Sequence, residues 1–182
     1  REVPMHKPFQ FDVQRIIEEA NKQSAALIVL CSPNNPTGTC LSEGAVRLIL
    51  ESTSSLVVLD EAYVQFAAGS LSHLLREYDR LVILQTFSKA MAAAGLRFGY
   101  ALASPAIVRQ LQKVKLPYSV NIFTLTAVDV FIEQWERIRP WIDVIIAERA
   151  MLSSRLGALP TLRVYESGAN FLLFETLRRT PR

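Results

Sequence analysis

Continuous apolar runs, rather than alternating ones, are the main pattern in the first half of this chain. They cover residues 25–31, 56–59 and 81–86, and residues 98–103 form a fourth strand-like segment. Apolar residues that continue without alternation are typical of parallel strands buried on both faces. We therefore expect a mostly parallel sheet flanked by helices on both faces.

Helical spacing of apolar residues fills the segments between these strands. Asp12 and Ser42 each stand directly before such a segment, where we expect them to act as N-caps. The expected helices cover residues 12–20, 42–52, 71–78, 105–115 and 122–132. Alternation of strands and helices with short connections indicates an α/β fold class.

The pattern changes after residue 156. A long helix is expected over residues 133–156, with a kink at Pro140, because proline removes a backbone donor inside a helix. Two strand-like segments follow closely, at residues 162–165 and 169–174. We therefore divide the chain into a large domain, residues 1–156, and the beginning of a smaller C-terminal α/β domain, residues 157–182.

Composition limits the classes of function. The net charge is only +3, and the single basic cluster, residues 178–182, is better interpreted as a chain end than as a nucleic-acid tail. No apolar run approaches the roughly eighteen residues of a membrane helix. Cys31 and Cys40 do not form a CxxC pair, and His6 and His73 are isolated. We expect a cytoplasmic protein that binds no nucleic acid, membrane or metal.

Two charged residues follow two of the apolar runs. Asp60 ends one run, and Lys89 comes shortly after the next. Ligands of open parallel sheets bind at the carboxyl ends of the strands. An acid and an amine at that edge suggest pyridoxal phosphate, which needs a lysine for its Schiff base and often an aspartate for its pyridinium nitrogen. The simpler alternatives are a solvated strand-end lysine and an aspartate that caps a turn.

Small residues follow Lys89 in the sequence. A lysine in such surroundings can be partly desolvated, which favours its neutral, nucleophilic form.

Other polar side chains follow the same runs. Asn35 could donate an amide hydrogen bond to a cofactor oxygen, although turn chemistry explains its loop equally well. Arg97 could bind a phosphate in a bidentate way, with the hydroxyls of Thr86 and Ser88 beside it. A surface arginine and two strand-end hydroxyls are the alternative. Neither a P-loop string nor GxGxxG occurs, which disfavours nucleotide binding.

Taken together, these motifs resemble those of the fold-type-I aminotransferases, which depend on pyridoxal phosphate. The matching strings are SPNNPTG at 32–38, DEAY at 60–63, TFSK at 86–89, GLRFG at 95–99 and SGANF at 167–171. The similarity runs through nearly the whole chain and is closest to the histidinol-phosphate aminotransferase branch.

The resemblance implies roles for individual residues. Lys89 would carry the cofactor and then move the α-proton of the substrate as general base and acid. Asp60 would pair with the pyridinium nitrogen, while Asn35 and Tyr63 would hydrogen-bond the ring oxygen. The resemblance to the histidinol-phosphate aminotransferase branch implies transfer of an amino group from histidinol phosphate to 2-oxoglutarate.

The remaining implied roles concern the cofactor phosphate and the substrate carboxylate. Thr86, Ser88 and Arg97 would hold the cofactor phosphate, and Asn170 would approach the substrate carboxylate. In the family, a Gly-containing phosphate cup and a ring-stacking aromatic precede residue 1, and a carboxylate-binding arginine follows residue 182. The resemblance therefore implies a fragment of a homodimeric enzyme, inactive and weak in cofactor binding by itself.

Several alternatives stay open from the sequence. Threonine-phosphate decarboxylase shares every motif named above, and aminotransferases of aromatic amino acids use a similar scaffold. A regulator with a cofactor-binding domain and an N-terminal winged helix belongs to another functional class. A non-catalytic α/β domain with coincidental motifs is the least favoured interpretation.

Overall fold

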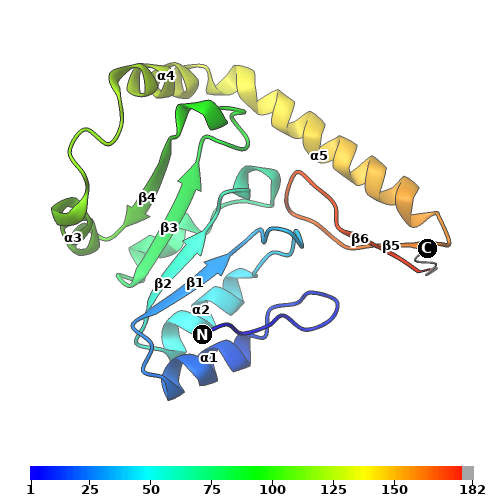
Figure 1. Ribbon diagram of the computed structural model, residues 1–182, viewed down its shortest axis with the longest axis horizontal. Helices are drawn as coiled ribbons and strands as arrows, with labels where there is room; N and C mark the ends of the chain where they lie inside the picture. Colours follow the sequence, from blue (N-terminus) through cyan, green and yellow to red (C-terminus); the bar gives the residue numbers. More distant parts are fainter. Residues whose placement is uncertain (178–182) are drawn as a thin grey trace, which may run out of the picture.

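A four-stranded sheet forms the centre of the fold (Figure 1). A computed structural model describes residues 1–177 of the chain, so the basic cluster at 178–182 lies outside the described residues. The strands lie in the order β1 (Leu27–Cys31), β2 (Leu56–Asp60), β3 (Leu81–Thr86) and β4 (Gly99–Ala103). β1, β2 and β3 are parallel, whereas β4 is antiparallel to β3.

The strand register brings three carboxyl ends to one edge of the sheet. Cys31 stands opposite Asp60, and Asp60 stands opposite Leu84. In Figure 1 this edge faces the long helix α5 (Trp135–Gly157). Loops that follow β1, β2 and β3 therefore meet on one side of the molecule, as expected for a parallel arrangement.

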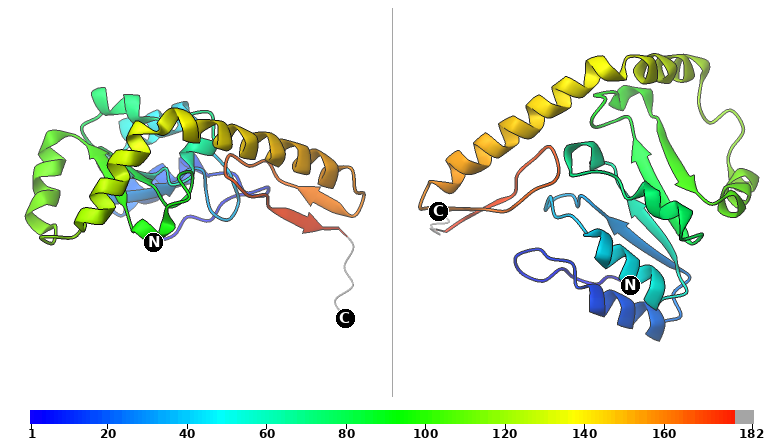
Figure 2. Two further views of the ribbon diagram at one scale, coloured as in Figure 1. Left: turned by 90° about the horizontal axis from the view of Figure 1, so that it is seen from above. Right: turned by 180° about the vertical axis from the view of Figure 1, so that it is seen from behind.

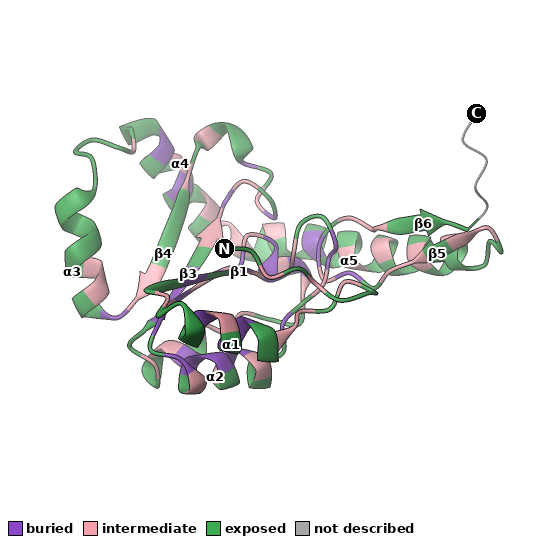
Figure 3. Cartoon of the chain, turned by 60° about the horizontal axis from the view of Figure 1, so that its bottom comes forward, coloured by how far each residue is buried: buried purple, intermediate pink, exposed green. Residues whose placement is uncertain are grey.

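Two amphipathic helices cover one face of the sheet, α1 (Val13–Lys22) and α2 (Glu43–Ser52) (Figure 3). The Asp12 carboxylate accepts a hydrogen bond from Arg15 N at 3.1 Å, and the Ser42 hydroxyl accepts one from Ala45 N at 3.2 Å. Both N-cap predictions are confirmed. The core between helices and strands is aliphatic, and its most buried members are Val46, Ile49, Leu50, Val57, Leu59, Leu74, Leu81 and Ile83.

The other face of the sheet is partly open. Val29 is 64% exposed and Leu27 is 50% exposed, although both lie in β1. The prediction that both faces are covered is wrong for residues 1–177, because α1 and α2 pack on the same face. An uninterrupted apolar run favours burial of both faces of a strand, but within residues 1–177 only the face that packs against α1 and α2 is well covered.

Glu61, the residue after β2, ties the following segment to the sheet. Glu61 is 1% exposed, and its carboxylate accepts hydrogen bonds from Ser70 Oγ at 2.6 Å, Leu71 N at 2.8 Å and Gln85 Nε2 at 2.8 Å. A buried carboxylate requires such partners. The helix expected at 71–78 is a shorter 3₁₀ helix, η2 (Ser72–Arg76).

Three further helices follow β4, namely α3 (Pro105–Val114), α4 (Ile122–Glu133) and α5. All three were expected, and α5 continues through Pro140 as a single helix. Within residues 1–177, no helix combines the length and apolar character needed to cross a membrane.

A small antiparallel pair ends the described chain. β5 (Leu162–Val164) pairs with β6 (Phe174–Thr176) alongside the last turns of α5 (Figure 2). The strand expected at 169–174 is wrong, because residues 168–171 form a bend and the strand begins only at Phe174. In this bend Ala169 N donates to Ser167 Oγ at 3.1 Å and Ala169 O accepts from Arg149 Nη1 at 2.6 Å, so neither is available to a neighbouring strand. The domain division after residue 156 stays a prediction.

Candidate active site

The residues singled out in the sequence come to the carboxyl edge of β1, β2 and β3. Asn35 lies in the loop after β1, Asp60 ends β2 and Lys89 follows β3. Asp60 Oδ1 accepts a hydrogen bond from Ala62 N at 2.9 Å, so this carboxylate also stabilises the turn that leads to Tyr63. The turn-capping interpretation and a position at the ligand-binding edge are thus compatible.

Tyr63 contacts two of the other candidate residues at this edge, Asn35 and Lys89. Its hydroxyl accepts a hydrogen bond from Asn35 Nδ2 at 2.9 Å, and its ring is buried. Lys89 Nζ lies 5.1 Å from the centroid of the same ring, within range of a cation–π contact. Three loops that are distant in sequence therefore deliver an amide, a phenol and an amine to one place.

Lys89 is exposed, so the partial desolvation expected from the sequence is wrong for this chain. Ala92 and Ala94 are exposed, whereas the small residues Ala90 and Ala93 are packed into the molecule. They support the backbone under the lysine, but the amine itself extends beyond the strand end.

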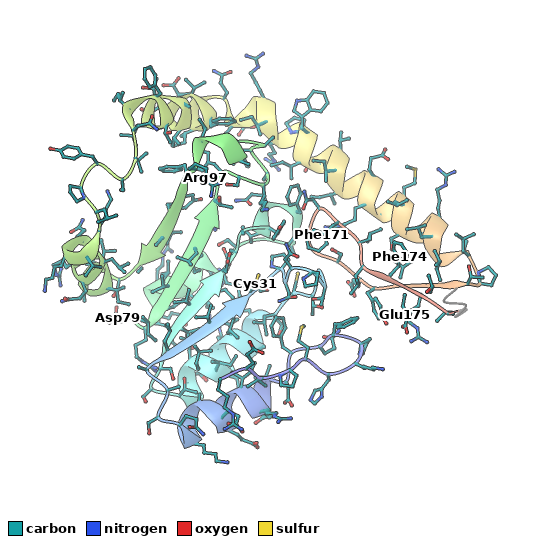
Figure 4. The ribbon with its side chains drawn as sticks, viewed as in Figure 1. Cys31, Asp79, Arg97, Phe171, Phe174 and Glu175 are labelled. Carbon is teal, nitrogen blue, oxygen red and sulfur yellow. The ribbon has the colours of Figure 1, made fainter. Side chains whose placement is uncertain are left out.

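The hydroxyls after β3 are paired, whereas the arginine is not joined to them. Ser88 N donates to Thr86 Oγ1 at 3.1 Å, and the two hydroxyl oxygens lie 3.0 Å apart. Arg97 is exposed beyond the end of β3 (Figure 4), and its Nη1 donates to Ala94 O at 3.0 Å. Arg97 also has a left-handed backbone, with φ 53°, which is uncommon for a residue with a side chain.

The loop 167–171 reaches the same region from the C-terminal end of the chain. Asn170 is exposed. Its neighbour Phe171, labelled in Figure 4, packs edge-on against Tyr63, with ring centroids 5.2 Å apart. The structure thus brings Asn170 toward Tyr63 through Phe171, without a direct bond between Asn170 and the other candidate residues.

Sequence reasoning missed Arg149 on α5. Its Nη1 donates to two backbone oxygens, Phe66 O at 3.0 Å and Ala169 O at 2.6 Å. Arg149 follows Ile142 and Ile146 at helical spacing, and Ile142 is buried. A charged residue in line with an apolar stripe was the signal that could have identified it.

The cysteine beside the site is not set up as a nucleophile. Burial raises the pKa of the Cys31 thiol above its ordinary value, and the Asp60 carboxylate adds to the rise. A raised pKa keeps the thiol protonated and weakly reactive at neutral pH. No group of three or more His, Cys, Asp and Glu side chains suited to a metal occurs within residues 1–177.

A cavity of about 1000 Å³ is lined in part by Ser167 and Gly168 of the loop 167–171. Its walls include Gly38, Cys40, Arg149, Arg163 and Tyr165. Lys89 and Asp60 are not among its lining residues. The candidate catalytic groups therefore lie outside this cavity, and Arg149 stands in its wall.

Comparison with known proteins gives the family. Residues 1–180 match the model of the family described as aminotransferase class I and II. The histidinol-phosphate aminotransferase of Thermococcus kodakarensis is 46% identical over 172 residues, which are 94% of this chain and 49% of that protein.

Solved structures agree on the fold. The histidinol-phosphate aminotransferase of Sinorhizobium meliloti, solved with pyridoxal-5'-phosphate, has a TM-score of 0.88 at 23% identity, over 98% of this chain and 49% of that one. The L-threonine-O-3-phosphate decarboxylase of Porphyromonas gingivalis has a TM-score of 0.79 at 24% identity, over 94% and 54%.

The expected fold class is therefore confirmed: this is part of a fold-type-I α/β architecture. The chain spans about half the length of the curated relatives that it matches. With a family model that covers residues 1–180, the chain belongs to the aminotransferase class I and II family.

Proposed function

We propose that this chain forms the central part of a pyridoxal-phosphate-dependent aminotransferase. The observation that carries the proposal is the convergence of Asn35, Tyr63 and Lys89 at the carboxyl edge of a parallel sheet. The proposed reaction is transfer of the amino group of histidinol phosphate to 2-oxoglutarate. The curated relatives named histidinol-phosphate aminotransferase, at 33–46% identity, support this choice of substrate.

The chemical types of the side chains fit this cofactor. An amine, a carboxylate and an amide–phenol pair stand at one edge, and two paired hydroxyls and a guanidinium follow the neighbouring strand. We assign Asp60 to the ring nitrogen and Asn35 with Tyr63 to the ring oxygen. When bound, pyridoxal phosphate supplies an aldehyde that condenses with amines and a ring that withdraws electrons from the substrate α-carbon.

In the proposed mechanism the protein's own groups bind and move protons. Lys89 Nζ would take the proton from the substrate α-carbon and later return it, as base and then acid. The Asp60 carboxylate would keep a proton on the ring nitrogen. Asn35 Nδ2 orients Tyr63 Oη through their 2.9 Å hydrogen bond, so that the hydroxyl can donate to the ring oxygen.

The remaining residues are assigned to the cofactor phosphate and to the substrate carboxylate. Thr86, Ser88 and Arg97 would bind the cofactor phosphate, because hydroxyls and a guanidinium are phosphate donors. Arg97 Nη1 donates to Ala94 O, so Nε and Nη2 would supply donors to a phosphate oxygen. Asn170 would approach the substrate carboxylate from the loop 167–171.

We also propose a homodimer and a cytoplasmic location. Large apolar side chains between and on the later helices are exposed, such as Tyr118 at 99% and Phe123 at 83%, which suits an interface. Cys31 and Cys40 are both free, as is usual in a reducing compartment.

The test is the visible absorption spectrum of the complete protein that contains this chain, with pyridoxal phosphate added. Three forms are compared: the unchanged protein, Lys89→Ala, and the control Lys113→Ala. Lys113 is a matched lysine on the surface of α3, where it bonds Gln110. We expect a band from the lysine-bound cofactor in the unchanged protein and the control, but not in Lys89→Ala.

Addition of histidinol phosphate should bleach that band, and 2-oxoglutarate should restore it. A band that ignores histidinol phosphate would refute the proposed substrate. Release of carbon dioxide from threonine phosphate would assign the protein to the decarboxylases instead. Absence of the band in all three forms would refute the cofactor and the enzyme together.

A further inference from the structure

The loop 167–171 is held mainly by bonds to other parts of the chain. Gly168 N donates to Gly38 O at 2.8 Å, which ties it to the segment that carries Asn35. Ala169 is fully buried, and its carbonyl oxygen accepts the 2.6 Å hydrogen bond from Arg149. The backbone next to Asn170 is therefore placed by residues outside the loop.

The same Arg149 nitrogen also bonds the segment that carries Tyr63. It donates to Phe66 O at 3.0 Å, and Phe66 N donates to Tyr63 O at 3.0 Å. Phe66 itself is 1% exposed. A single side chain of α5 thus bridges the segment after Asp60 and the loop that carries Asn170.

We propose that Arg149 is a positioning residue that fixes the loop 167–171 against the Tyr63 segment. By doing so, it sets where Phe171 meets the Tyr63 ring and where Asn170 stands relative to Lys89. The inference rests on the proposed function only for its catalytic consequence. The two hydrogen bonds of Arg149 to Phe66 O and Ala169 O do not depend on the proposed function.

Two physical features support a positioning role. Hydrogen bonds from a charged donor are stronger than neutral ones, and a guanidinium presents its donors in a rigid plane. Arg149 also projects from a helix that is anchored by buried Ile142, which is 4% exposed. Side chains on an anchored helix hold their targets more accurately than side chains on loops.

The experiment compares Arg149→Met, Arg149→Lys and the control Arg139→Met in the complete protein with pyridoxal phosphate. Methionine keeps the apolar stem of the arginine without its donors, and Arg139 is an exposed arginine of the same helix. Hydrogen exchange is measured for residues 165–172, where the amides of Tyr165 and Gly168 have backbone acceptors. Residues 56–60 of β2 serve as the internal reference.

We expect exchange in residues 165–172 to become roughly 10- to 150-fold faster in Arg149→Met, the range that corresponds to loss of one charged hydrogen bond. The lysine variant should be intermediate, and Arg139→Met and the β2 segment should not change. Unchanged exchange in Arg149→Met, or an equal increase in Arg139→Met, overturns the proposal. Should Arg149→Met fail to fold, exchange in Arg149→Lys no faster than in the unchanged protein overturns it.

The catalytic consequence is read in the same proteins. Arg149→Met should keep the cofactor band and raise the KM for the amino substrate about tenfold, with a smaller change in kcat. A fall in kcat at constant KM contradicts the positioning role. If the unchanged protein has no cofactor band, the proposed function fails, while the exchange measurement still decides whether Arg149 fixes the loop.

Discussion

Replacement of Gly38 by alanine should destabilise the chain more than any ordinary glycine substitution. Gly38 has φ 77°, a left-handed conformation that alanine adopts poorly. A Cβ at this position would lie 2.5 Å from Ser167 Cβ and 2.8 Å from Ser167 Cα, and would also overlap Ser167 Oγ. Backbone atoms cannot move out of the way as a flexible side chain can, so the loop 167–171 would have to shift.

The magnitude follows from two separate costs. The left-handed conformation costs alanine roughly 1–2 kcal/mol. Overpacking of a tightly filled site costs roughly 1–3 kcal/mol. The free energy of unfolding should therefore fall by about 2–5 kcal/mol, which corresponds to a melting temperature lower by roughly 4–20 °C for a domain of this size.

The assay is thermal and urea unfolding, followed by circular dichroism, with Gly44→Ala as the matched control. Gly44 lies in the first turn of α2 and has open space around the position of a Cβ, so the same substitution should raise the free energy of unfolding by at most about 0.5–1 kcal/mol. The two variants should therefore change stability in opposite directions. A loss below about 0.5 kcal/mol in Gly38→Ala would refute the close-packing argument.

Two further predictions concern charged groups. Glu61→Gln should lower the free energy of unfolding by about 1–3 kcal/mol, because an amide cannot accept all three hydrogen bonds of the buried carboxylate; a urea midpoint equal to that of the exposed control Glu2→Gln would contradict this. Hydrogen bonds from Arg47 lower the pKa values of Glu43 and Glu77 below 4.5, so their contribution is present above that pH and is lost on acidification. Arg47→Met should therefore be less stable than the unchanged chain at pH 7, and at about pH 2 the difference should shrink to what the contacts of Arg47 with Tyr78 contribute. An equal difference in unfolding free energy at both pH values would be evidence against this ion-pair network.

Local sequence was sufficient for the elements with strong local signals. The caps Asp12 and Ser42 were identified because a short polar side chain before an amphipathic run satisfies free backbone donors at a helix start. The β1, β2 and β3 segments were identified because long apolar runs have few other uses in a chain of this length. The family motifs likewise lie in contiguous strings.

Local sequence failed where distant segments compete for the backbone. The strand expected at 169–174 is displaced because Ala169 bonds Arg149, which lies 20 residues away along the chain. The exposure of Val29 was missed for a similar reason, since burial of a strand face depends on which helices pack on it.

The sequence by itself determined the residue types at the candidate site, the order of strands and helices, and the family to which the chain belongs. Only the tertiary structure decided that Asn35 donates to Tyr63, that Lys89 lies over the Tyr63 ring, and that Arg149 joins the Tyr63 segment to the loop 167–171. The physical reason is the distance along the sequence between the residues that interact. Propensity and capping act within a few residues, whereas these contacts form only after parallel pairing has brought three separate strand ends to one edge.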